Sequence, residues 1–158
     1  AGLPLETGEG TASPGDVVLH ELKEDILTVD TVGAFAESAV LLDVRAPNRY
    51  RGETEPFDPI AGHIPGAVNL PSEEYLAGPF FRPADELRAV FESAGVDGTG
   101  AAGVYCGSGL TAAQAVFAAE RAGLTLRIYP GSWSEWSNTP GAQVATGASK
   151  SSSEIVAQ

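Results

Sequence analysis

Residues 101–122 read AAGVYCGSGLTAAQAVFAAERA, and the fold class can be inferred from this stretch. Ala101–Tyr105 is a short apolar run, which predicts a buried strand. Thr111–Ala122 is rich in alanine and stops at Gly123, which is typical of a helix. Cys106 therefore stands where a buried strand passes through a short loop into a helix.

Strand-like and helix-like segments alternate along the rest of the chain as well. Further strands are predicted at Ala39–Val44, Ala67–Leu70 and Leu124–Tyr129, and helices over Thr31–Glu37 (N-cap Asp30) and from Pro83 to Gly95. Such alternation predicts an α/β fold, in which a parallel sheet is flanked by helices on both faces. Because ligands gather beyond the carboxyl ends of parallel strands, Cys106 and the pair Asp43 and Arg45 are expected at one rim.

Length and composition indicate one domain with flexible ends. A chain of 158 residues with 43% hydrophobic composition can bury one core. Residues 1–16 are polar and rich in glycine and proline, which predicts a linker. We predict the domain over residues 17–137 and a flexible tail with nothing to pack over residues 138–158.

Charge and cysteine content exclude several classes of protein. A net charge of −12 and a pI near 4.4 argue against nucleic acid as a partner, because phosphate binding needs clustered Lys and Arg. No apolar run approaches the about 18 residues that a membrane span requires, so no membrane partner is expected. A single cysteine forms no internal disulfide, which favours a cytoplasmic protein. Because the chain contains no methionine, we expect it to be a processed piece and not a complete translation product with its initiator intact.

The loop after Cys106 favours an ionised sulfur. Gly107 and Gly109 allow the backbone to curl and to turn several N–H groups inward, and the start of the following helix adds the positive end of its dipole. A cysteine that serves only for packing requires no such cradle of amides. We therefore interpret Cys106 as a nucleophile.

The neighbouring residues narrow the thiolate chemistry. Acyl transfer needs a general base, and neither His20 nor His63 is an obvious one. A cysteine phosphatase requires an arginine six residues after the cysteine, where this chain has Ala112, so phosphatase and arsenate reductase activities are disfavoured. An amide cradle with the hydroxyls of Ser108 and Thr111 suits a smaller anion, the persulfide R–S–S⁻.

Four motifs in this order resemble the rhodanese family, from about Ile26 to Trp136. They are Asp43-Val44-Arg45, the segment GHIPGAVN at residues 62–69, the loop from Cys106 to Thr111, and the segment YPGSWSEW at residues 129–136. The resemblance implies a rhodanese-like fold and a sulfurtransferase whose catalytic Cys106 carries sulfur as a persulfide. It implies an active-site loop formed by Gly107, Ser108, Gly109, Leu110 and Thr111.

Three further residues receive roles in this interpretation. Arg49 is the candidate for binding the anionic group of the donor, because a planar guanidinium fits a carboxylate or sulfonate in a bidentate manner. Asp43 and Arg45 are expected to order the loops around the site.

No cofactor and no metal are expected; the partners are a small-molecule sulfur donor and a thiol or cyanide acceptor.

More closely, the chain resembles the C-terminal, catalytic half of tandem-domain thiosulfate and 3-mercaptopyruvate sulfurtransferases, which implies an absent N-terminal rhodanese-like domain. The Gly-Ser-Gly loop is similar to the mercaptopyruvate type. That type also has a second arginine shortly after Arg49, where this chain reads EPFDP at residues 55–59, so both donors remain open. The alternative function is a non-catalytic sulfur carrier or interaction module that needs the absent half.

Overall fold

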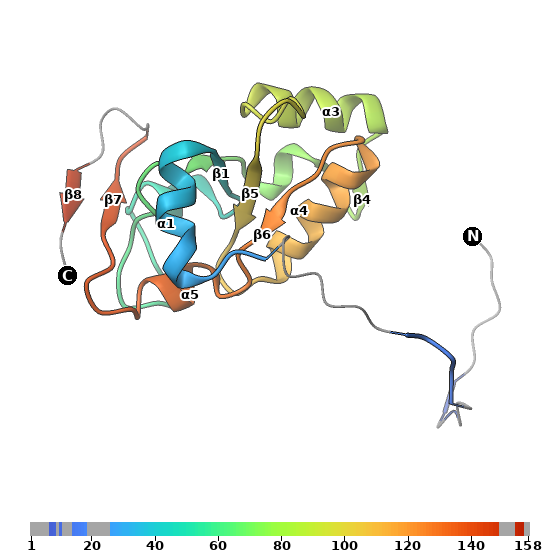
Figure 1. Ribbon diagram of the computed structural model, residues 1–158, viewed down its shortest axis with the longest axis horizontal. Helices are drawn as coiled ribbons and strands as arrows, with labels where there is room; N and C mark the ends of the chain where they lie inside the picture. The colour runs from blue at the N-terminus through green and yellow to red at the C-terminus, as the bar shows by residue number, and fades with distance from the viewer. Residues whose placement is uncertain (1–6, 9, 11–13, 19–25, 149–153, 157–158) are drawn as a thin grey trace.

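The computed structural model describes residues 7–8, 10, 14–18, 26–148 and 154–156. At its centre lies a four-stranded parallel sheet in the order β2-β1-β5-β6 (Figure 1). The strands are β1 (Val40–Asp43), β2 (Val68–Asn69), β5 (Ala102–Tyr105) and β6 (Arg127–Ile128). The predicted parallel α/β fold is therefore confirmed.

The helices cover both faces of this sheet (Figure 1). They are α1 (Val29–Ser38), α2 (Pro47–Tyr50), α3 (Ala84–Ser93), α4 (Leu110–Arg121) and α5 (Ser132–Trp136). Two antiparallel pairs lie outside the sheet: β3 (Leu76–Ala77) with β4 (Phe80–Phe81), and β7 (Val144–Thr146) with β8 (Glu154–Val156). A short 3-10 helix spans Ser72–Glu74.

The period-two geometry of the strands divides the core in two. Leu42 packs with α3 and α4 on one face, and its neighbour Leu41 packs with α1 and α5 on the other. Both side chains are fully buried. A Cβ on Gly103 of β5 would lie 2.9 Å from side-chain atoms of Leu27 and Phe35, so this glycine allows α1 to approach closely.

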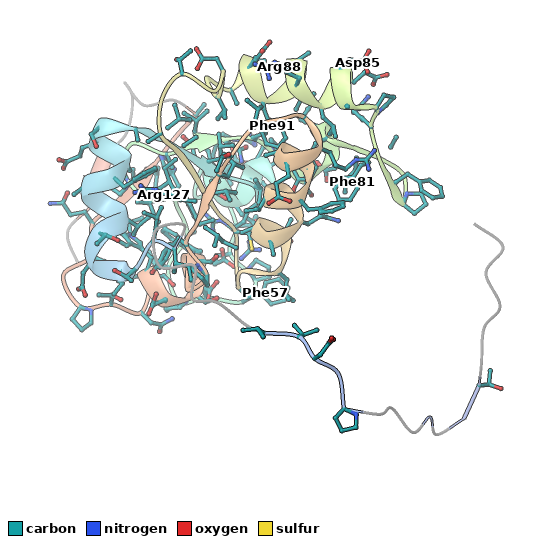
Figure 2. All side chains as sticks on the ribbon, turned by 45° about the vertical axis from the view of Figure 1, so that its right-hand side comes forward. Phe57, Phe81, Asp85, Arg88, Phe91 and Arg127 are labelled. Carbon is teal, nitrogen blue, oxygen red and sulfur yellow. The ribbon has the colours of Figure 1, made fainter. Side chains whose placement is uncertain are left out.

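Helix α3 shows how the sequence pattern directs packing. Leu87 and Phe91, four residues apart, are fully buried against the sheet, whereas Asp85 and Arg88 are exposed. Figure 2 shows Phe91 pointing inward and both charged side chains pointing outward. Among the helices described, none combines the length and apolar character needed to cross a membrane.

Two sequence expectations differ from the structure. Helix α1 has Thr28, not Asp30, as its N-cap, and the Thr28 N–H donates to Oγ1 of Thr31 at 2.9 Å. Asp30 instead lies in the first turn, where its charge favours the helix dipole. The tail expected from residue 138 has much to pack, because Ala142 and Val144 are buried in the core on the α1 face.

Candidate active site

Cys106 follows directly after β5, at the carboxyl edge of the sheet. Its side chain is almost fully buried, and the Gly109 N–H donates to its Sγ at 3.1 Å. Helix α4 begins one residue later, at Leu110. The thiol therefore lies at the N-terminal end of a twelve-residue helix, on the side where backbone N–H groups are not used within the helix.

Helix α5 fixes the orientation of the loop. The N–H groups of Trp133 and Ser134 donate to the carbonyls of Cys106 and Gly107, both at 2.9 Å. In a trans peptide the carbonyl and the following N–H point in opposite directions, and the described residues contain no cis peptide. The N–H groups of Gly107 and Ser108 therefore point away from α5.

The tight turn of the loop requires glycine at position 109. Gly109 has a φ of 88°, and a Cβ there would lie 2.6 Å from the carbonyl oxygen of Pro130. The strand-to-helix turn that follows β6 thus touches the cysteine loop. Ser132 in that turn has a φ of 56°, a conformation that non-glycine residues adopt seldom.

Asp43 and Arg45 form a buried ion pair behind the loop. Nη2 of Arg45 lies 2.6 Å from Oδ2 of Asp43 and donates to the carbonyl of Gly62 at 2.6 Å, while Oδ1 of Asp43 accepts from the Arg45 N–H. Burial by itself lowers the pKa of Arg45. The Asp43 carboxylate raises this pKa by more than burial lowers it, so the pKa stands well above its ordinary value. The guanidinium also lies over the ring of Trp133, 4.5 Å from its centroid.

Arg49 is held at the site by two carboxylates from the segment that follows α2. Its Nε and Nη2 donate to Glu55 at 3.1 and 2.6 Å, and Nη2 lies 3.7 Å from Oδ2 of Asp58. The remaining nitrogen, Nη1, lies 3.4 Å from where a Cβ on Gly107 would be, and thus faces the cysteine loop. Glu55 also accepts from Arg45 at 3.2 Å.

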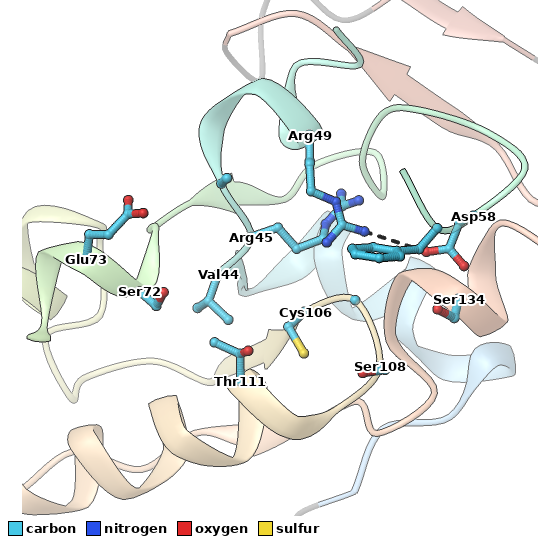
Figure 3. Close-up of a pocket in the computed structure, with 13 residues that line it drawn as sticks. Val44, Arg45, Arg49, Asp58, Ser72, Glu73, Cys106, Ser108, Thr111 and Ser134 are labelled. Carbon is cyan, nitrogen blue, oxygen red and sulfur yellow. Dashed lines mark ion pairs between the residues drawn. The ribbon is translucent and has the colours of Figure 1, made fainter. Parts of the chain in front are cut away.

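A cavity of 320 Å³ opens above the cysteine (Figure 3). It is lined by Val44, Arg45, Ala46, Arg49, Phe57, Asp58, Ser72, Glu73, Cys106, Gly107, Ser108, Thr111 and Ser134. The structure thus brings together the cysteine, both candidate arginines and the loop hydroxyls. Leu110 does not line the cavity and is 81% exposed. Asp43 is fully buried and lies behind the wall of the cavity.

Several residues of this region are not predicted by the sequence patterns. These patterns show only that an arginine is lacking at residues 55–59 and give Glu55, Phe57 and Asp58 no role. The closeness of the two carboxylates, Glu55 and Asp58, to Arg49 in sequence could have indicated that they pair with it. Ser132 accepts a hydrogen bond from the Cys106 N–H at 3.1 Å. No local pattern indicates this contact, because it depends on the packing of two strand ends.

His63, Trp133 and Trp136 are buried in the core, where their contacts are those of packing residues. His63 is fully buried and stacks on Tyr50 with ring centroids 3.8 Å apart. Trp133 and Trp136 are buried on one face of α5 and donate to the carbonyls of Ile60 and Gln143. His20 lies outside the described residues.

Fold and site together define a class, a small parallel α/β domain that presents one cysteine in a glycine-rich loop at the start of a helix. The model of the rhodanese-like domain matches residues 21–139, and the chain belongs to this family.

Relatives and solved structures agree with this assignment. The chain is 44% identical over 151 residues to a putative thiosulfate sulfurtransferase, SseB, of Mycobacterium tuberculosis, covering 93% of this chain and 53% of SseB. It is 41% identical to a probable 3-mercaptopyruvate sulfurtransferase of Pseudomonas aeruginosa, covering 93% and 54%. The chain therefore spans about half the length of these relatives.

A solved structure extends the likeness to three dimensions. EanB in complex with ergothioneine covalently linked to a persulfide cysteine superposes with a TM-score of 0.77 at 25% identity. The match covers 89% of this chain and 36% of EanB.

Proposed function

We propose that this domain is a sulfurtransferase that moves a sulfane sulfur from thiosulfate or 3-mercaptopyruvate to cyanide or a thiol through a persulfide on Cys106. The surroundings of the Cys106 Sγ support this function most strongly. The sulfur accepts the Gly109 N–H, lies at the start of α4 and borders a cavity that also contains Arg49. The names of the relatives support the same pair of donors.

The first half of the reaction loads the cysteine. The Cys106 thiolate attacks the outer sulfur of thiosulfate, a sulfur–sulfur bond forms to Sγ, and the bond to the sulfonate sulfur breaks to release sulfite. With 3-mercaptopyruvate the thiol sulfur is attacked, the carbon–sulfur bond breaks, and the thiol proton ends on carbon, giving pyruvate. Both donors leave Cys106 as a persulfide anion.

The second half returns the enzyme to its starting state. Cyanide or a thiolate attacks the outer sulfur of the persulfide, and the bonding pair returns to Sγ. The products are thiocyanate or a new persulfide, together with the free Cys106 thiolate. Two chemical steps that share one covalent intermediate form a ping-pong cycle.

The surrounding groups hold anions at each stage. In this proposal, the amides of Gly107 and Ser108, which point away from α5, bind the terminal persulfide sulfur together with the Thr111 hydroxyl at the cavity wall. Nη1 of Arg49, which faces Gly107, binds the carboxylate or sulfonate of the donor. Asp43 and Arg45 keep the strand end and the carbonyl of Gly62 in place.

A thiocyanate assay of the full chain with cyanide and each donor tests the proposal. We expect thiocyanate with at least one donor and none from Cys106→Ser, which keeps the size of the side chain. Turnover that survives this substitution would refute the assignment of the nucleophile. Formation of the persulfide without thiocyanate would instead favour a sulfur carrier that requires its partner domain.

A further inference from the structure

The carboxylate of Asp58 lies beside Arg49 at the wall of the cavity, with its Oδ2 buried. Its Oδ2 lies 3.7 Å from Nη2 of Arg49, beyond hydrogen-bonding distance, and it has no hydrogen-bond partner among the residues that the structure describes. The side chain is only 8% exposed, yet it lines the cavity (Figure 3). Burying a carboxylate oxygen without a hydrogen-bond partner costs free energy. The Asp58 carboxylate is therefore expected to interact with the Arg49 guanidinium.

The chain segment that carries Asp58 restrains it beside Arg49. Pro56 and Pro59 flank the short stretch, and each fixes its own backbone φ. Within the stretch, the ring of Phe57 lies under the Arg49 guanidinium, 5.3 Å from its carbon to the ring centroid. Asp58 therefore remains within reach of the guanidinium that receives the donor.

Carboxylates outnumber guanidiniums around this part of the cavity. Arg45 and Arg49 are linked in one network with Asp43, Glu55 and Asp58. With every group ionised, the network carries one net negative charge. Asp43 and Glu55 have both oxygens hydrogen-bonded to arginine, so Asp58 is the carboxylate that remains able to compete with a ligand.

We infer that Asp58 is a specificity-determining residue, whose carboxylate competes with the donor for Arg49 and makes the site favour monoanionic over dianionic sulfur donors. This inference rests on the proposed function, in which Arg49 binds the anionic group of the donor. Asp58 disfavours thiosulfate, a dianion, more than 3-mercaptopyruvate, whose carboxylate carries one charge. The residue thus acts on the choice of donor through Arg49.

Coulomb's law gives the expected pattern. The energy of repulsion between Asp58 and the donor is proportional to the charge of the donor. The factor by which Asp58 slows the loading of a dianion is therefore the square of the factor for a monoanion. For a partly exposed site, removing the charge should increase the rate of loading about 3-fold for 3-mercaptopyruvate and about 10-fold for thiosulfate. The ratio between donors should therefore change by about 3-fold.

The experiment measures the second-order rate constant of persulfide formation on Cys106 in the full chain, by mass spectrometry at low ionic strength. Asp58→Asn removes the charge and keeps the shape. Glu73→Gln is the matched control, because Glu73 is an exposed carboxylate on the same cavity that forms no ion pair with Arg49. We expect the donor ratio to shift toward thiosulfate in Asp58→Asn and to stay near the wild-type ratio in Glu73→Gln.

A second readout needs no sulfur transfer. Anions that occupy Arg49 should protect Cys106 from iodoacetamide, and Asp58→Asn should strengthen protection by sulfate more than protection by acetate. An unchanged sulfate-to-acetate preference, or the same shift in Glu73→Gln, overturns the role of Asp58. Failure of both donors to form the persulfide, with protection shifted as expected, counts against the proposed function alone.

Discussion

The hydroxyl of Ser132 accepts a hydrogen bond from the Cys106 N–H at 3.1 Å, and its own proton has two possible acceptors. The Ser132 Oγ lies 3.0 Å from the carbonyl oxygen of Tyr129 and 3.9 Å from the Sγ of Cys106. The shorter distance favours the carbonyl. Ser132 therefore fixes the backbone at the base of the loop more than it stabilises the sulfur.

Ser132→Ala should destabilise the fold. It leaves the buried Cys106 N–H without an acceptor, which costs about 1–3 kcal/mol of unfolding free energy. Ser137→Ala is the matched control, because the Ser137 Oγ is buried without a hydrogen-bond partner in the described part of the chain. Urea unfolding should show a loss for the first variant and no loss for the second; equal losses would contradict this role of Ser132.

Gly109→Ala should disrupt the active-site loop. An added Cβ collides with the carbonyl of Pro130, so the loop has to move and Gly109 can no longer hold Sγ in the same way. Gly141→Ala provides the comparison, since Gly141 also has a positive φ, 79°, but has open space around it. The control should lose about 1–2 kcal/mol of stability from backbone strain and load sulfur normally. Gly109→Ala should lose more stability and most of its persulfide formation.

Glu55→Gln should loosen both arginines at once. The Glu55 side chain is 3% exposed and pairs with Arg45 and Arg49, so removing its charge takes away the carboxylate that these two guanidiniums share. We expect a loss of about 3 kcal/mol in unfolding free energy. Glu53→Gln breaks an exposed pair with Arg51 and should change stability little. Similar midpoints of thermal unfolding for the two variants would refute the importance of the Glu55 network.

His63 should make stability fall in mild acid. The Tyr50 carbonyl accepts from Nδ1 at 2.7 Å, so Nε2 would receive any added proton, and Nε2 has no hydrogen-bond partner among the described residues. Burial lowers the pKa of His63 below its ordinary value, although the hydrogen bond to Tyr50 opposes this. The unfolded chain therefore binds the proton first, and stability decreases as the pH falls through about 6.5.

The measurement is the urea midpoint between pH 7.5 and pH 5.5. In the wild type we expect a lower midpoint at the acidic end. His63→Asn keeps a donor for the Tyr50 carbonyl and removes the titrating ring, so the part of the pH dependence that His63 contributes should disappear. A slope unchanged by this substitution would show that other groups cause the acid sensitivity.

The sequence predicted the parallel sheet and the position of Cys106 because both depend on local patterns. Continuous apolar runs mark buried strands, and a cysteine followed by Gly-Ser-Gly before an alanine-rich helix marks a strand-to-helix loop. The start of α1 was misplaced because Thr28 and Asp30 are both good N-caps, and local preference does not separate them. In the structure, the contacts between Thr28 and Thr31 mark Thr28 as the cap.

Several contacts around the cavity could not be predicted from the sequence, because they join distant segments. Ser132 meets Cys106 across 26 positions of the chain. The pairing of His63 with Ala145 likewise depends on β7, a stretch that looked too polar to pack. Glu55 and Asp58 lie close to Arg49 in sequence, yet only three-dimensional geometry shows that one edge of the guanidinium stays directed at the loop.

Persulfide formation on Cys106 can be measured as the mass of the Cys106 peptide after treatment with thiosulfate or 3-mercaptopyruvate. We expect a gain of one sulfur atom on this peptide, which cyanide removes and which Cys106→Ser abolishes. No added sulfur with either donor, or a sulfur adduct that persists in Cys106→Ser, would contradict the proposed persulfide on Cys106.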